Sequence, residues 1–216
     1  MEINQLLFSM EHLNIVSAAD FIKLLQEQKG SIGLHGATLV KDAIDLRGLY
    51  DKLPSLHIRN VVFLGWVTVT DFKDPEQSID FTDCEFFQHL RVKECIGKCI
   101  SLHSCNASAV SLQDCKYESA FLRDVHVSGR LNFGGLMLNK KKGCFHITET
   151  TYEEFILLPT ADSTKKNCWP IIKTDDEALI LQLCALGIPV AIDTQLAKKM
   201  VAKGLPPATL RSISGS

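Results

Sequence analysis

The chain of 216 residues has little net charge and no long apolar segment. Its 23 Lys and Arg against 25 Asp and Glu give a formal net charge of -2. That balance argues against binding to nucleic acid or to an anionic membrane surface, since both need a strong basic excess. No apolar run approaches the ~20 residues that span a bilayer, and residues 1–5 lack the basic region of a secretory signal. We therefore expect a cytoplasmic protein that does not insert into a membrane.

Ten short blocks, centred on apolar anchors 10 to 12 residues apart, repeat one pattern. The anchors are Leu34, Leu46, Ile58, Val69, Phe81, Val92, Leu102, Leu112, Leu122 and Phe133. The residues two before and three after each anchor are apolar as well. The residue two after it is always small or polar: Gly36, Gly48, Asn60, Asp71, Asp83, Glu94, Ser104, Asp114, Asp124 and Gly135. Alternation predicts a short strand, and the small or polar residue predicts a corner.

Identical apolar positions in ten successive blocks favour a solenoid, because stacked coils reuse each interior position. One block is too short to enclose a core, so we expect two blocks per coil, or about twenty residues, and about five coils. Four of the eight cysteines occupy one interior position: Cys84, Cys95, Cys105 and Cys115. This spacing predicts that Cys84 stacks near Cys105 and Cys95 near Cys115. Buried thiols in a reducing compartment should remain unoxidised.

The repeat resembles the pentapeptide-repeat and related right-handed β-helix families over residues 32–138. The resemblance implies a right-handed β-solenoid. From this and the ten blocks, we expect a mainly β protein whose solenoid is capped by α-helices at both ends. We assign residues 1–30 to an N-terminal helical cap, 31–139 to the solenoid, 140–207 to a mixed helical segment and 208–216 to a flexible tail.

Helix signals at both ends predict these caps, which solenoids need to cover their open ends. Residues 3–10 have helical apolar spacing, and a second helix should begin at Ser17 and end at Gly30. Residues 174–177 form a capping box for a helix that ends at Gly187. After an apolar connection at 188–192, Asp193 or Thr194 should cap a last helix that runs to 203.

Two patterns of reactive side chains bear on metal binding and on nucleophilic catalysis. Cys95, Cys99 and His103 carry ligand types that zinc prefers, but the repeat should point their side chains to different sides. A nucleophilic Cys–His pair needs direct contact, which no spacing here indicates. We therefore predict no metal, no cofactor and no catalytic residue.

The outward residues beside the anchors form a polar ladder that a protein could dock on. We predict a non-enzymatic protein–protein interaction module, a scaffold or adaptor; a bacterial effector or a subunit of a multiprotein assembly would both fit. A last-helix stripe adds apolar candidates. The candidate partner-binding residues are Arg59, Arg91, Lys93, His103, Arg123, Leu196, Met200 and Val201.

Residues 88–95, Gln-His-Leu-Arg-Val-Lys-Glu-Cys, resemble the Gln-Gln-x-Arg segment of tubulin-folding-cofactor-C-like β-helix domains, with His89 in place of the second glutamine. In that family the arginine can act as a finger on the phosphates of a GTPase. The resemblance implies an alternative function, a GTPase-activating protein with Arg91 as the finger. Alternation with inward Leu90 and Val92 predicts that Arg91 faces outward.

Overall fold

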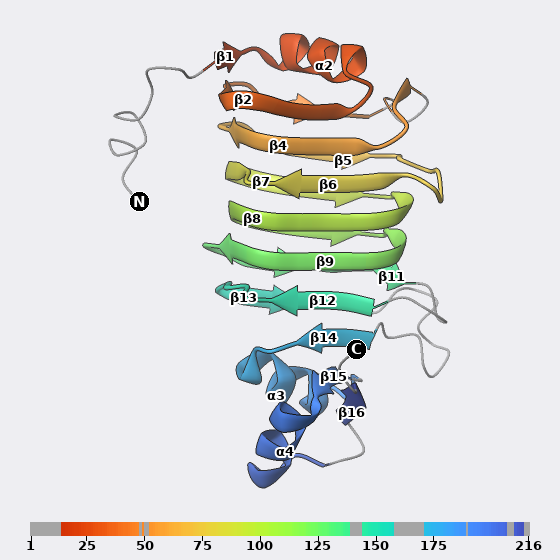
Figure 1. Ribbon diagram of the computed structural model, residues 1–216, viewed down its shortest axis with the longest axis vertical. Helices are drawn as coiled ribbons and strands as arrows, with labels where there is room; N and C mark the ends of the chain where they lie inside the picture. Colours follow the sequence, from red (N-terminus) through yellow and green to blue (C-terminus); the bar gives the residue numbers. More distant parts are fainter. Residues whose placement is uncertain are drawn as a thin grey trace.

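The computed structural model describes residues 14–47, 49, 52–138, 144–157, 171–188, 190–206 and 210–213. These residues form a parallel β-solenoid of about six turns, with helix α2 at one end and α3 and α4 at the other (Figure 1). In Figure 1 the chain descends while the near strands run from right to left, a right-handed winding. The predicted mainly β solenoid with helices at both ends is confirmed.

The elements follow one another along the chain as β1 (Asn14–Val16), α2 (Ala18–Glu27), β2 (Ser31–Val40), β3 (Ile44–Asp45), β4 (Leu56–Phe63), β5 (Val67–Thr70), β6 (Ser78–Thr82), β7 (Glu85–Lys93), β8 (Ile96–Gln113), β9 (Lys116–Val127), β10 (Arg130–Asn132), β11 (Met137–Leu138), β12 (Cys144–Thr148), β13 (Glu154–Ile156), β14 (Ile171–Thr174), α3 (Glu177–Ala185), β15 (Val190–Asp193), α4 (Thr194–Ala202) and β16 (Leu210–Ile213).

Each coil has four sides, which we call faces A to D in chain order. In one coil they comprise residues 99–103 (A), 105–107 (B), 109–113 (C) and 115–117 (D), and the same residues pair in parallel with the coils on either side. Faces A and C lie on opposite sides of the core. The in-register residues Ile58, Phe81, Leu102, Leu122 and Ile147 repeat every 20 to 25 positions, so two blocks make one coil, as predicted.

The corners between faces form where the repeat predicted them. Seven non-glycine residues there have left-handed backbone, with φ between 50° and 64°: Asn60, Asp71, Asp83, Glu94, Ser104, Asp114 and Asp124. Gly135 adopts φ 77° at the same position, and Glu149, outside the ten blocks, adopts φ 51°. Asn, Asp and Gly tolerate this backbone better than other residues, which explains their recurrence.

The interior is an apolar column with stacked rings near its N-terminal end. The rings of Phe63 and Phe86 stack at 5.1 Å, and Phe21 of α2 meets Phe63 edge-on at 5.6 Å. The side chain of Ser17 caps α2 by accepting from the backbone N–H of Asp20, and Gly30, with φ 84°, follows the helix. Helix α2 therefore covers the first coil, as its sequence predicted.

The four repeat cysteines point inward and are buried. Cys84 lies beside Cys105 and Cys95 beside Cys115 on neighbouring coils, which confirms the predicted pairing. Each thiol donates to two backbone carbonyls; the Sγ of Cys105, for example, lies 3.4 Å from the oxygen of Phe81 and 3.2 Å from that of His103. Hydrogen bonding to the paired thiol and burial raise the pKa of Cys84 and of Cys115.

An eleventh corner, unpredicted, repeats this arrangement with a hydroxyl. Thr150 follows Glu149, is buried, and its Oγ1 donates to the carbonyls of Leu122 and Thr148 at 3.4 and 3.0 Å. The parallel stacking thus continues past residue 139 through β12, β14, β15 and β16. Residues 190–193, expected as a connection, and 210–213, expected in a flexible tail, pair as strands β15 and β16.

The first block departs from its predicted register. Ile32, not Leu34, pairs with Ile58, and the register shifts between Gly33 and Thr38. The C-terminal helices end near their predicted limits, but Asp176, rather than Thr174, caps α3 by accepting from the N–H groups of two residues. Asp193 caps α4 in the same way. The helix predicted at 3–10 lies outside the described residues.

Candidate functional site

The predicted cation ladder divides between two opposite faces. Arg59, His103 and Arg123 share one outward column of face A, with Thr82 between the first two. Arg91 and Lys93 lie on face C, two residues apart on β7. Blocks alternate between faces A and C, so equivalent positions of consecutive blocks never meet.

Face A carries a polar cluster around Asp80. The carboxylate of Asp80 accepts a short hydrogen bond from the hydroxyl of Ser101 and one of 3.4 Å from that of Thr82. His57 Nδ1 lies 3.9 Å from the same carboxylate, beside a hollow of about 310 Å³ that Arg59 also lines. The carboxylate stands between Ser101 and His57, whereas activation of a serine requires the histidine to contact the hydroxyl. The cluster is therefore not a nucleophile–base arrangement.

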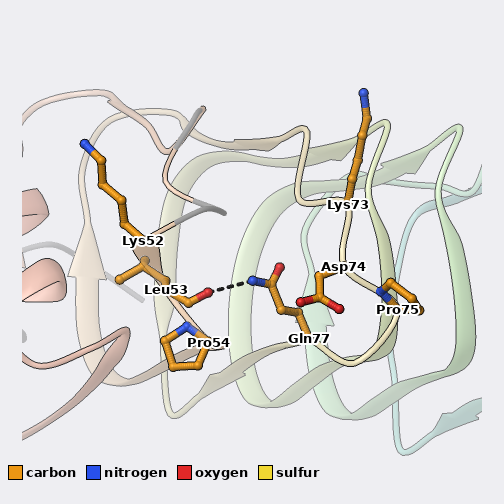
Figure 2. Close-up of a pocket in the computed structure, with 7 residues that line it drawn as sticks. All are labelled: Lys52, Leu53, Pro54, Lys73, Asp74, Pro75 and Gln77. Atoms are coloured by element: carbon orange, nitrogen blue, oxygen red, sulfur yellow. Dashed lines mark hydrogen bonds between the residues drawn. The ribbon is translucent and has the colours of Figure 1, made fainter.

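A larger open hollow of about 610 Å³ lies where residues 52–54 approach residues 73–77. Figure 2 shows that the side chains of Lys52 and Lys73 extend away from it. The side-chain amide of Gln77 donates to the carbonyl of Leu53 at 2.6 Å, and the Asp74 carboxylate accepts from the N–H of Glu76 at 2.9 Å. These contacts hold two neighbouring coils and a turn together, so we assign the hollow a structural role.

Face C carries the most distinctive surface of the molecule. Trp66 is 50% exposed and lies in register with His89 of the next coil. The centroids of their two rings are 5.8 Å apart. The Nε2 of His89 lies 2.7 Å from the hydroxyl of Ser111, which is buried. Arg91 follows two residues after His89 on the same strand. An aromatic ring, an imidazole and a guanidinium thus lie on two neighbouring strands of one parallel sheet.

Arg91 adds an unpaired positive charge to this surface. Burial and, after it, the charge of Arg91 lower the pKa of His89. The Nε of Arg91 is buried without a hydrogen-bond partner. Among the described residues, the Arg91 side chain makes no ion pair or hydrogen bond.

Apolar side chains extend this surface around the corner to face B. Leu64 is 36% exposed and Phe87 is half-buried, and the two lie on adjacent coils because Phe63 pairs with Phe86. We call Leu64, Trp66, Phe87, His89 and Arg91 together the Trp66 surface. Sequence reasoning found Arg91 but missed Trp66 and His89, although both stand three residues before an anchor of the repeat.

The stripe predicted on the last helix faces mainly inward. Met200 is fully buried and Leu196 is partly buried against the core, whereas Val201 is 40% exposed. Glu177 of α3 forms ion pairs with Lys199 of α4 and with Lys203, which directly follows α4, and these hydrogen bonds lower the pKa of Glu177 to about 2. The C-terminal helices therefore pack on the solenoid and on each other, which leaves Val201 as the exposed member of the stripe.

The three side chains with zinc-ligand chemistry, those of Cys95, Cys99 and His103, do not come together in the structure. Cys95 points into the core, while Cys99 and His103 lie on face A. In the described part of the chain, no group of three His, Cys, Asp or Glu side chains could hold a metal ion. None of the described helices is long and apolar enough to cross a membrane.

Comparison with known proteins gives no relative. No protein-family model matches the chain, and neither a curated protein nor a solved structure matches it. The case for function therefore depends on the geometry of the solenoid faces.

Proposed function

We propose that the protein is a non-enzymatic protein-interaction module that docks a partner on the Trp66 surface. The observation that carries the proposal is Trp66, 50% exposed, on the coil that neighbours Arg91, whose side chain has no partner among the described residues. Trp and Arg are the residues most enriched among binding hot spots. An aromatic ring left in water and a guanidinium left unpaired both gain free energy when a partner covers them.

The rigidity of the solenoid supports the same proposal. β7, which carries His89 and Arg91, pairs with β5 on one side and β8 on the other, so its backbone is held from both sides. A surface fixed before binding loses less conformational entropy when it docks. Face C can thus present Trp66 and Arg91 in one arrangement, as a scaffold or adaptor requires.

Affinity purification with quantitative mass spectrometry tests the proposal. The full chain is compared with Trp66→Ala and Arg91→Gln, and with Arg59→Gln and Arg123→Gln as matched changes on face A. We expect one set of proteins to be lost with both face C variants and retained with both face A variants. Equal recovery with all four variants would contradict docking on the Trp66 surface, as would loss with the face A variants alone.

One observation favours a second function, stimulation of GTP hydrolysis by Arg91. A finger must reach outward, and Arg91 is on the outside of β7 with its Nε unpaired; such arginines accelerate hydrolysis ~10³–10⁵-fold. The assay measures GTP hydrolysis by a panel of small GTPases with the wild type, Arg91→Ala and Arg59→Ala. Stimulation that Arg91→Ala abolishes and Arg59→Ala retains would support this function. If the wild type stimulates none of the GTPases tested, the protein does not activate any of them and this function is refuted for that panel.

A further inference from the structure

We infer that the partner of the Trp66 surface is an extended acidic segment that places a carboxylate against Arg91 and an apolar side chain against Trp66. This inference rests on the proposed function and specifies the chemistry of its partner. It starts from the Arg91 guanidinium, which the described residues leave without an acceptor.

Arg91 has donors that no described residue accepts from. Its Nε is buried with no hydrogen-bond partner, so an incoming group does not reach that atom, whereas its two Nη groups are neither buried nor bonded among the described residues. A carboxylate can accept two parallel N–H bonds from a guanidinium, here from the two Nη groups. Binding of a carboxylate would therefore pair a charge that is unpaired in the free protein.

The charges around Arg91 also favour an anion. Two acids near face C form ion pairs, Glu94 with Lys93 and Asp71 with Lys73, both at 2.8 Å. Asp45, two rungs from Arg91 in the same column, accepts from the backbone N–H of Arg47 at 2.9 Å. On the neighbouring strands, Thr68 and Ser111 stand in register with Arg91, and neither carries a charge. The positive charge of Arg91 is therefore not balanced by a neighbour in its own column.

The spacing of the two side chains fits an extended peptide. Trp66 is in register with His89, and Arg91 stands two residues further along the strand direction. That offset is ~7 Å, the separation of side chains at positions i and i+2 of an extended chain. A segment lying along the strands of face C can thus place an apolar residue on Trp66 and an acidic residue at Arg91, with one residue between them.

Nuclear magnetic resonance of the Arg91 Nε–Hε group in the full chain tests the inference. The signal is assigned by its loss in Arg91→Lys, and spectra are recorded near pH 6 to slow proton exchange. The probes are the blocked tripeptides acetyl-Leu-Ala-Glu-amide and acetyl-Glu-Ala-Leu-amide, with acetyl-Leu-Ala-Gln-amide and inorganic phosphate as controls. The Hε of Arg59, on face A, is the internal reference.

We expect at least one glutamate peptide to shift the Arg91 Hε signal saturably in the millimolar range, because pairing of the Nη groups changes the electronic environment of the whole guanidinium, while the Arg59 signal stays unchanged. Trp66→Ala should weaken this binding severalfold, and Arg91→Lys, read by Trp fluorescence in a Trp169→Phe background, should weaken it about tenfold because the paired N–H geometry is lost.

An unmoved Arg91 signal would overturn the inference, as would an equal response to the glutamine peptide or a stronger response to phosphate. The peptide assay uses no natural partner, so its failure differs from failure of the docking proposal. If Trp66→Ala loses partners in the affinity purification but the peptides do not shift the Arg91 signal, docking on the Trp66 surface is supported and the acidic partner is refuted.

Discussion

Truncation of Leu102 tests the packed interior of the solenoid most directly. Its side chain is 0% exposed and lies in register between Phe81 and Leu122 of the neighbouring coils. Leu102→Ala removes three buried carbons, worth ~2.4 kcal/mol at ~0.8 kcal/mol each. The ladder hydrogen bonds on both sides limit collapse into the space left, which adds a cavity cost of ~1–2 kcal/mol. We expect a total loss of about 3.4–4.4 kcal/mol.

Urea unfolding followed by circular dichroism of the strands measures this loss as a fall in the free energy of unfolding. The matched control is Gln113→Ala, which changes an outward, half-buried side chain and should shift the free energy by no more than ~0.5 kcal/mol. Leu102→Asp should be worse than Leu102→Ala, because it buries an unpaired charge. A loss below ~1 kcal/mol for Leu102→Ala, or one equal to that of the control, would refute the packed column.

Two further predictions concern thiol reactivity and pH. The four interior cysteines should alkylate slowly in the native protein and rapidly in denaturant, and the half-buried Cys99, Cys144 and Cys184 should be labelled before them. Mass spectrometry measures the order of labelling, and rapid native labelling of the interior set would contradict the assigned register. Ion pairing depresses the pKa of Glu177 to about 2. The ion pairs therefore contribute to the free energy of unfolding at pH values above the ordinary glutamate pKa of ~4.3, and this contribution is lost as the pH falls toward 2. Amide exchange in α4 should rise over that interval, less so in Glu177→Gln, and the effect should be small because the pairs with Lys199 and Lys203 are exposed.

The fold could be predicted from sequence because two independent signals agree from Ile58 onward. Apolar alternation indicated which residues face the interior. Corner residues such as Asp83 and Glu94 indicated where the chain passes from one face to the next, since a left-handed residue stands at each of these corners. At the first block only alternation was informative: Ile32 and Leu34 are both apolar, so a shift by two residues leaves the apolar pattern unchanged. In the structure, Ile32 rather than Leu34 pairs with Ile58.

The extension past residue 139 escaped prediction because one interior position changed its chemistry. Thr150 stands where an apolar residue or cysteine was expected, and its hydroxyl donates to the same two kinds of carbonyl as the thiols do. A rule based on hydrogen-bond donors as well as apolarity would have found the block around Ile147. The interior position thus accepts Cys or Thr for a shared physical reason.

The candidate site was predicted only in part. Alternation with Leu90 and Val92 placed Arg91 outside correctly. The other cations were grouped by position within the block, yet consecutive blocks belong to opposite faces, which separates Arg59 from Arg91. Trp66 could be located only once the coils were stacked, because its partner His89 is 23 residues away in sequence.

The stacking also determines how the molecule should respond to mechanical load. Helices α2 and α4 lie at opposite ends of the coil axis (Figure 1), so a pull between the ends acts across the rungs rather than along the strands. Each coil touches mainly its two neighbours, and coils repeat every 20 to 25 residues. A terminal coil can therefore peel away while the remainder stays folded, releasing roughly 70 Å of chain at each step. Under tension the solenoid should therefore lengthen in nearly equal increments, one for each coil that unfolds.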